Sequence, residues 1–471
     1  MRSFPRGAAV ATAVCAFVAV AGCAGDDTIV SLDGDAGLDA AAPFDGGPIA
    51  DGGSSDAFVN DTGTIDPAVT VVALGATGPI AGATVVFYSP DGSPQPALVT
   101  GVAGTVSAVV AAGSAVTISL FSQQNDGPLY DITTFIGLAP GDHLTAIPSR
   151  GLATTSADPG TVTVTTPGAI MDAATYDWAN GCNEARNAGG DQVLAVGPEC
   201  IGGADAGTLG IFGTANAVSG AWLASAEAVG ASYVDGGTVS GLAWSSIAPT
   251  LLPVSGSPNG APLSFEFAAA YYSGVHFYAD LDVKAVVAGA FTAPQITLPT
   301  SALLTDAVTT ARLEYPASTT PGAVAVQITQ APVVSGISVD FASMPPNVHD
   351  AIVTADGTGN GSLSFTADAA LTALDGLTAR YKLTIPLTDG GSANGTWVVV
   401  SPARTTTTMP TLTKDLLPSF PSTMKLVTAS LVHGTQYGSY GVYRRAYPKI
   451  AVGGELASAP YRVEAVFFGG N

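Results

Sequence analysis

Short runs in which apolar and polar residues alternate dominate the chain from residue 67 onward. Val69, Val71 and Ala73 are each separated by one residue, the period that turns one side of a β-strand toward a core. Glycine-containing turns such as Gly78-Pro79 separate these runs. The pattern predicts strands over 69–73, 83–88, 105–109, 115–120, 161–165, 208–217, 323–329, 336–341, 362–366, 381–385 and 396–400. We therefore expect an all-β protein built from short strands.

The composition agrees with short strands and disfavours long helices. The chain has 471 residues, of which 57 are Gly and 32 are Pro, and both residue types break helices. One short helix is predicted over Ala367–Leu374, because Leu371, Leu374 and Leu377 are spaced three apart and Thr366 is a suitable N-cap.

The segment 67–150 carries the resemblance to known modules. The stretches 78–85 (GPIAGATV), 101–106 (GVAGTV) and 112–114 (AGS) resemble the carboxypeptidase-regulatory-like and bacterial Ig-like modules. The resemblance implies an Ig-like or prealbumin-like β-sandwich that serves as a spacer or adhesive unit. That family has no catalytic residues to carry over.

The rest of the chain is predicted as one or two further β-rich domains. Residues 151–335 form a β-rich domain with a disulfide loop, and residues 336–471 form a C-terminal β-rich domain; alternatively the two are one unit. The predicted fold class is thus all-β, with two or three β-sandwich domains after a disordered acidic tether.

The N-terminus predicts export and lipidation. Arg2 and Arg6 precede an apolar run over 8–21, which is shorter than the ~20 residues that span a bilayer and is typical of a signal peptide, here 1–22. The run ends in Val20-Ala21-Gly22-Cys23, which resembles the bacterial lipoprotein lipobox. The resemblance implies that Cys23 carries acyl chains such as palmitate, and several chains anchor stably. The alternative is an ordinary cleavage site beside a chance cysteine.

Localisation and the tether follow from the same region. Ala24 rather than Asp after the cysteine favours the outer membrane or cell surface over the inner membrane. Residues 23–66 form the predicted tether, with ten Asp and no Lys or Arg, and such a stretch buries too little apolar surface to fold. It would span roughly 36 Å r.m.s.. A calcium loop at 33–37 is disfavoured because it lacks a closing Glu.

Charge excludes one class of partner. The net charge is −22, and no Lys or Arg lies between Arg6 and Arg150, whereas phosphate binding needs clustered cations. We therefore expect no nucleic-acid partner. From residue 401 onward seven basic residues outnumber three acidic ones, so this end retains a candidate polyanion site.

Cysteine usage agrees with an oxidising compartment. Cys15 leaves with the signal peptide and Cys23 takes lipid, so Cys182 and Cys200 remain as a predicted disulfide. A bridge closing a loop of this length would stabilise the fold by about 3 kcal/mol. The alternative, a two-cysteine metal site, lacks a histidine nearby in sequence.

No familiar catalytic motif is present in the sequence, and the chain has four His, which leaves little general-base capacity. Whether it is an enzyme is uncertain, and a non-catalytic role is favoured. The one metal hypothesis is calcium at Asp280 and Asp282, which share a strand face and lie about 6.6 Å apart. The alternative is the wet face of an amphipathic strand. No other cofactor is predicted.

A tyrosine- and arginine-rich segment near the C-terminus is the candidate ligand-binding site. If the segment is extended, Tyr443, Arg445 and Tyr447 share a face that could bind sugar rings or a polyanion. The alternative is that these side chains lock a terminal hairpin internally. The full candidate set is Tyr437, Tyr440, Tyr443, Arg444, Arg445 and Tyr447.

These features predict a non-catalytic envelope or cell-surface lipoprotein that scaffolds, adheres or binds an envelope component. Its expected partners are the membrane, through the lipid, and a polysaccharide or envelope protein. The alternative is a carbohydrate-binding or accessory module with weak hydrolase activity. A third hypothesis is a stalk component of a larger assembly, which an exposed apolar edge or patch would indicate.

Overall fold

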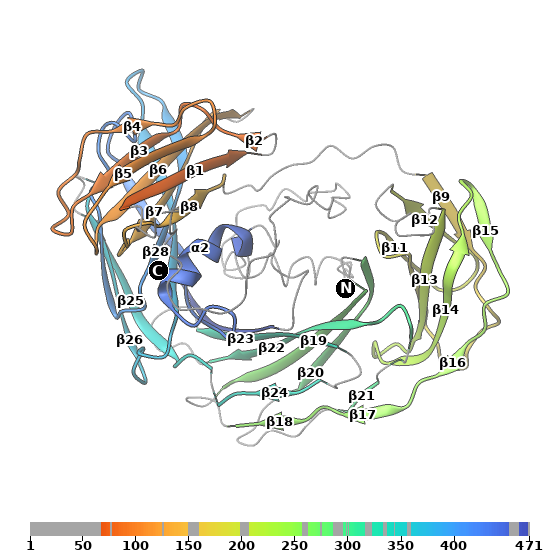
Figure 1. The fold of residues 1–471 in the computed structure, drawn as a ribbon. Helices are drawn as coiled ribbons and strands as arrows, with labels where there is room; N and C mark the ends of the chain where they lie inside the picture. Colours follow the sequence, from red (N-terminus) through yellow and green to blue (C-terminus); the bar gives the residue numbers. More distant parts are fainter. Residues whose placement is uncertain are drawn as a thin grey trace, which may run out of the picture.

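A computed structural model gives the fold of the chain (Figure 1). It describes residues 67–75, 78–124, 127–148, 160–197, 207–256, 262–273, 276–285, 295–297, 299, 301–315, 323–332, 337–342, 344–355, 359–451 and 461–469. Apart from one helix, the described elements are strands, which confirms the predicted all-β class. The ribbons follow an arc, with the first strands at one end and strands β9 to β16 at the other.

A twelve-stranded sheet forms the body of the arc. In spatial order its strands are β20 (His276–Ala285), β19 (Ser264–Ser273), β22 (Asp306–Glu314), β23 (Val324–Pro332), β31 (Tyr461–Phe468), β30 (Thr423–Gly434), β27 (Gly376–Pro386), β28 (Ser392–Ser401), β7 (Gly127–Ile136), β6 (Ala115–Gln124), β3 (Thr84–Tyr88) and β4 (Leu98–Val99).

The sheet continues from the N-terminal to the C-terminal strands through a parallel pair, β7 and β28. Trp397 and Val399 of β28 face one core, and Val398 and Val400 face another, which explains why this strand reads as an unbroken apolar run. The Trp397 indole Nε1 donates to the Thr134 hydroxyl across the pair at 2.9 Å.

Smaller sheets cover both faces of the large one. One face packs against a four-stranded sheet and against helix α2 (Tyr440–Ala451). The four strands are β1 (Ala68–Gly75), β2 (Gly78–Pro79), β5 (Thr105–Val109) and β8 (His143–Ala146). The other face packs against β25 (Val348–Ala355), β26 (Gly361–Ala367) and β29 (Thr406–Met409), and against the ladder of β18 (Val254–Ser255) with β24 (Val339–Asp340).

A separate small sandwich occupies residues 160–246. Its core contains Trp178, Leu194 and Ile211, all fully buried. One sheet contains β9 (Gly160–Val164), β12 (Gln192–Val196) and β15 (Gly237–Val239); the other contains β10 (Thr175–Ala179), β11 (Glu184–Asn187), β13 (Thr208–Asn216), β14 (Trp222–Ser232) and β16 (Ser245–Ser246). A two-stranded ladder, β17 (Pro249–Leu251) with β21 (Gln295–Thr297), follows it.

Two predictions from the sequence differ from this architecture. The twelve-stranded sheet crosses the predicted boundary at 150 through the β7–β28 pair, and it crosses 335 through the β23–β31 pair, which fits the alternative that 151–471 is one unit. The predicted helix over 367–374 is wrong: β26 ends at Ala367, and a turn in which the Leu374 amide donates to the Leu371 carbonyl leads into β27. The spaced leucines instead contact the core from this turn and from β27.

The signal peptide, Cys23 and the tether lie outside the described residues and stay predictions. No helix in the described part of the chain is long and apolar enough to cross a bilayer.

Candidate functional site

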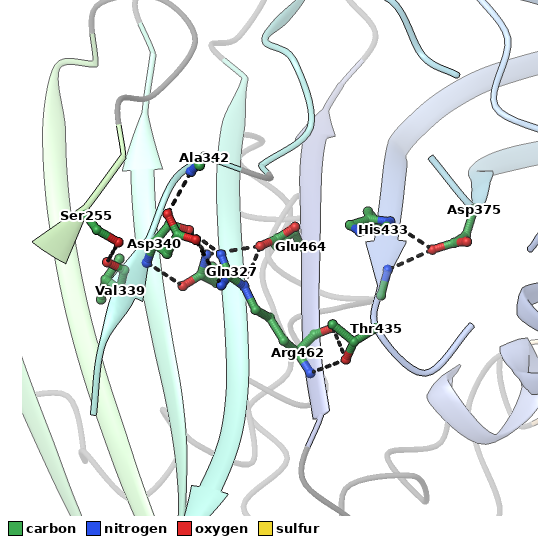
Figure 2. Close-up of polar contacts among 11 residues, drawn as sticks. Ser255, Gln327, Val339, Asp340, Ala342, Asp375, His433, Thr435, Arg462 and Glu464 are labelled. Carbon is green, nitrogen blue, oxygen red and sulfur yellow. Dashed lines mark hydrogen bonds and ion pairs between the residues drawn. The ribbon is translucent and has the colours of Figure 1, made fainter. Parts of the chain in front are cut away.

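A row of polar side chains crosses the large sheet between strands β23, β31 and β30 (Figure 2). Gln327 lies opposite Glu464 in the β23–β31 register, and Glu464 lies opposite His433 in the β31–β30 register. Glu464 and Gln327 are almost fully buried, and they share the sheet face that Arg462 also occupies. A buried carboxylate requires partners, so its contacts determine what the row does.

Arg462 neutralises Glu464 along the same strand. The Arg462 Nε donates to Glu464 Oε1 at 2.6 Å, and the Gln327 amide donates to the same oxygen at 3.2 Å. Arg462 also lies 3.3 Å from the Asp340 carboxylate on β24. One guanidinium therefore links two carboxylates from different strands, which is the fork geometry that arginine favours.

Asp340 completes the connection to the covering ladder. The Ala342 amide donates to Asp340 Oδ1 at 3.0 Å, and the Asp340 amide donates to Gln327 Oε1 at 3.1 Å. The backbone hydrogen bond from Ala342, followed by Arg462, holds the pKa of the Asp340 carboxyl below its usual value. The row thus fastens the β18–β24 ladder to the large sheet.

His433 and Asp375 extend the row toward β27. The His433 Nδ1 lies 3.2 Å from Asp375 Oδ2, and the Gly434 amide donates to the same oxygen at 2.8 Å. The histidine is partly exposed and Asp375 is buried. Sequence reasoning missed this row, although a Glu inside the apolar strand 463–468 and a Gln inside 324–328 were available signals.

The predicted tyrosine–arginine segment is helical, not extended, because α2 begins at Tyr440. Tyr437, Tyr443 and Arg444 are buried, whereas Tyr440, Arg445 and Tyr447 are partly buried. The Tyr437 and Tyr443 rings meet edge to face at 5.4 Å, and the Tyr443 hydroxyl pairs with the Thr378 hydroxyl at 2.7 Å. These side chains therefore serve internal packing, as the alternative interpretation held, but through a helix rather than a hairpin.

Arg444 ties the helix to the residue that precedes β8 of the four-stranded sheet. Its guanidinium forms an ion pair with Asp142, and both side chains are at most 3% exposed. The guanidinium also donates to the Gly137 carbonyl and lies 5.2 Å from the centre of the Tyr440 ring. The Tyr440 hydroxyl lies 3.0 Å from the Val400 carbonyl oxygen, so the helix spans the β7–β28 join.

Asp280 and Asp282 lie on β20 at the opposite end of the sheet. Asp282 is exposed, while Asp280 faces Glu184 and Arg186 of β11. Burial, followed by the charge of Glu184, raises the pKa of Asp280 to about 7. Arg186 is already engaged in a two-point ion pair with Asp177.

Calcium binding at this pair stays a prediction. Within the described residues no group of three or more His, Cys, Asp or Glu side chains is arranged to hold a metal ion. The Asp280 Oδ2 is buried without a hydrogen-bond partner, which fits a protonated carboxyl better than a ligand charged at neutral pH.

Cys182 lies in the turn between β10 and β11 and is disulfide-bonded. Cys200 lies outside the described residues, so the pairing of these two cysteines stays a prediction. The Asn180 side chain shapes the turn: its Oδ1 accepts from the Asn183 amide at 2.8 Å and its Nδ2 donates to the Ala195 carbonyl at 2.7 Å.

Comparisons with known proteins identify no family. No family model and no curated protein matches the chain. Among solved structures, the FN1–FN3 domains of chicken CNTN1 align with 12% identity over 59% of this chain and 93% of that chain, with a TM-score of 0.14. The native conformation of E. coli alpha-2-macroglobulin aligns with 10% identity over 83% of this chain and 27% of that chain, with a TM-score of 0.13. Such scores carry no argument, so the β-sandwich assignment rests on the sheets themselves, and the resemblance to carboxypeptidase-regulatory-like modules stays a prediction.

Proposed function

We propose that the chain is a lipid-anchored protein of the cell envelope or cell surface with a scaffolding or adhesion role and no catalytic one. The observation that carries the proposal is that the polar clusters of the protein form contacts between layers of its own fold. Arg444 with Asp142, and Arg462 with Glu464 and Asp340, join one layer of the fold to another. Charged side chains that pair between layers in this way hold the shape of the fold rather than act on a substrate.

The sequence supports the anchoring half of the proposal. The lipobox-like end at Cys23 supplies the acyl attachment, and the acidic stretch 24–66 separates it from the first strand. A sheet that runs through twelve strands would then project from the membrane as a stiff unit on a flexible tether.

The anchoring half is tested by expressing the full chain and Cys23→Ser in a bacterium fed with labelled palmitate. The wild-type chain should take up label and fractionate with membranes, whereas Cys23→Ser should do neither. Cys182→Ser is the matched control, since it removes a different cysteine and should leave labelling intact. Unlabelled wild-type chain in the soluble fraction would refute the anchor.

The scaffolding half is tested by crosslinking the anchored chain in intact cells, followed by mass spectrometry of captured proteins and polysaccharide. A scaffold should capture the same envelope component from independent cultures. A chain that captures nothing above the Cys23→Ser background would contradict a scaffolding or adhesion role.

Carbohydrate binding is a second candidate, and an aromatic pair of one exposed and one partly buried ring favours it. Phe121 on β6 is 59% exposed and lies opposite Tyr130 on β7, with ring centres 5.1 Å apart. Gln123 and Pro128 occupy the next position on the same face. The Phe121 and Tyr130 rings could stack on a sugar, and the Gln123 side-chain amide could hydrogen-bond it. Titration of envelope polysaccharide should show weaker binding by Phe121→Ala than by Val218→Ala, a control at a position 90% exposed. Equal binding by both variants would remove this candidate.

A further inference from the structure

Two edge strands of this protein, β25 and β20, carry features that block pairing with another strand. On β25 the register shifts between His349 and Ile352, and Asp350 between them has a φ of 54°. On β20 the Phe277 amide donates to the Gly181 carbonyl of the small sandwich at 2.9 Å, and Asp282 is exposed. Bulges, charges and covering segments are the usual means of blocking edge-to-edge pairing.

Strand β5 (Thr105–Val109) lacks these features. It pairs with β1 through five regular residue pairs without a register shift, and no strand among the described residues pairs with its other side. Between residues 67 and 125 the sequence contains a single charged residue, Asp91. The β5 sequence, TVSAV, contains neither proline nor charge.

The backbone groups that face outward can be assigned from one hydrogen bond. The Ala73 amide donates to the Gly104 carbonyl at 2.8 Å, so Gly104, Val106 and Ala108 direct their backbone groups toward β1. Thr105, Ser107 and Val109 therefore direct theirs away from the sheet. The Thr105 carbonyl accepts from the Gly101 amide at 3.2 Å, so pairing at this edge relies on the outward groups of Ser107 and Val109. The side chains of these three residues are also exposed, and Val109 is 67% exposed.

We propose that β5 is a self-association surface, at which a second copy of this chain adds its own β5 antiparallel about a two-fold axis at Ser107. Ser107 of each copy would then exchange two backbone hydrogen bonds with its counterpart, and Thr105 would lie opposite Val109. The pair would convert two four-stranded sheets into one continuous sheet.

A second copy fits this edge better than an unrelated strand, for reasons of charge and symmetry. The chain has a net charge of −22, so a self-association surface must lie where charge is absent, and 67–125 is such a region. A two-fold axis at Ser107 places uncharged, strand-favouring side chains opposite one another. The pairing does not depend on the proposed lipid anchor, although anchoring would raise the local concentration.

The register is tested by cysteine crosslinking of the full chain under mild oxidation. Opposed residues in a hydrogen-bonded pair lie about 5.5 Å apart between Cα atoms, within the range that a disulfide bridges. Ser107→Cys should therefore form a covalent dimer. In Thr105→Cys the two introduced thiols would be about 13 Å apart, so this variant should stay monomeric. Wild-type chain in the same conditions gives the background from native cysteines.

The association itself is tested by analytical ultracentrifugation over a wide concentration range. The wild-type chain should show a concentration-dependent dimer. Ser107→Lys places two ammonium groups opposite each other and should weaken the dimer at least tenfold. Ile352→Lys puts the same charge on the bulged edge β25, at a position 57% exposed, and should associate like wild type.

Circular dichroism melting checks that both lysine variants are folded. We expect both to melt like wild type, because both substitutions are at exposed positions. A wild-type chain that stays monomeric at the highest concentration overturns the proposal. So does a dimer that Ser107→Lys and Ile352→Lys weaken equally, or one in which Thr105→Cys crosslinks as well as Ser107→Cys.

Discussion

Two places on the twelve-stranded sheet attach neighbouring parts of the chain in different ways: the β7–β28 join inside the sheet, which is the first attachment, and the edge strand β20, which is the second attachment. At the β7–β28 join the ladder simply continues, with residues 394–400 of β28 paired to 129–135 of β7. Helix α2 then crosses the join, and Arg444 is buried against Asp142. At the β20 end a backbone bridge between Gly181 and Phe277 connects the small sandwich to the sheet.

The balance of cations and carboxyl groups also differs between the two attachments. Asp142 receives Arg444 at one side and lies 3.7 Å from Arg445 at the other, so cations outnumber the carboxylate. Near β20 one guanidinium, Arg186, is surrounded by the carboxyl groups of Asp177, Glu184 and Asp280. The comparison indicates that the first attachment is held by continuous pairing and by a carboxylate with surplus cations, whereas the second contains surplus carboxyl groups that respond to pH. Four substitutions test that contrast.

Removal of the buried partner at the first attachment should have the largest effect. Asp142→Ala leaves the Arg444 guanidinium buried without its carboxylate, so we expect the free energy of unfolding to fall by about 3–5 kcal/mol in urea denaturation. The double variant Asp142→Leu with Arg444→Met removes both charges and should recover most of that loss. If the single variant is as stable as wild type, the ion pair does not hold α2 to the four-stranded sheet.

The disulfide at the second attachment should have the next largest effect. Cys182 lies beside Gly181, whose carbonyl accepts the bridging hydrogen bond from the Phe277 amide, so the crosslink stiffens the weaker attachment. Cys182→Ser should lower the free energy of unfolding by about 3 kcal/mol. If Cys200 is the partner, Cys200→Ser and the double variant should each show the same loss. Additive losses would contradict the pairing.

The strands were predictable from the sequence because each has a local signal. Val69, Val71 and Ala73 alternate in the sequence and are fully buried in β1, and the predicted range 105–109 matches β5 residue for residue. Which strands pair was not predictable, because pairing over long sequence separations leaves no periodic pattern. Nothing local in Trp397 indicates that it lies beside Thr134.

The structure of the candidate binding segment could not be predicted from the sequence for a similar reason. The binding hypothesis for Tyr443 and Arg445 depends on the segment being extended, so that the two side chains share a face. Tertiary contacts decide otherwise: the helix is stabilised by burying Tyr443 and by pairing Arg444 with Asp142, about 300 residues earlier in the chain. Asp280 was correctly placed on a strand, but its neighbours Glu184 and Arg186 are close only in the fold.

The titration of Asp280 should give a smaller, pH-dependent effect. Its pKa is raised from 3.8 to about 7, so the folded protein keeps a proton that the unfolded chain loses. The contribution of Asp280 to stability is therefore greatest below about pH 4, falls as the pH rises toward 7, and is level above that. Asp280→Asn should remove this slope and be about 2 kcal/mol more stable than wild type at pH 8, since residual solvent contact screens part of the shift. Asp282→Asn, an exposed control, should keep the wild-type slope. An unchanged slope in Asp280→Asn would place the pH response elsewhere.

The smallest effect tests whether uncharged hydrogen bonds also secure the first attachment. Burial raises the pKa of the Tyr443 phenol, so its hydroxyl remains neutral and can pair with the Thr378 hydroxyl at any pH that the fold survives. Thr378→Val leaves that phenol buried without this partner and should lower the free energy of unfolding by about 1 kcal/mol at pH 5 and pH 8 alike. Adding Tyr443→Phe removes the stranded hydroxyl and should restore part of the loss, which a simple loss of packing would not allow. A loss that grows between pH 5 and pH 8 would show that charge controls this attachment too, and the contrast between the two attachments would then fail.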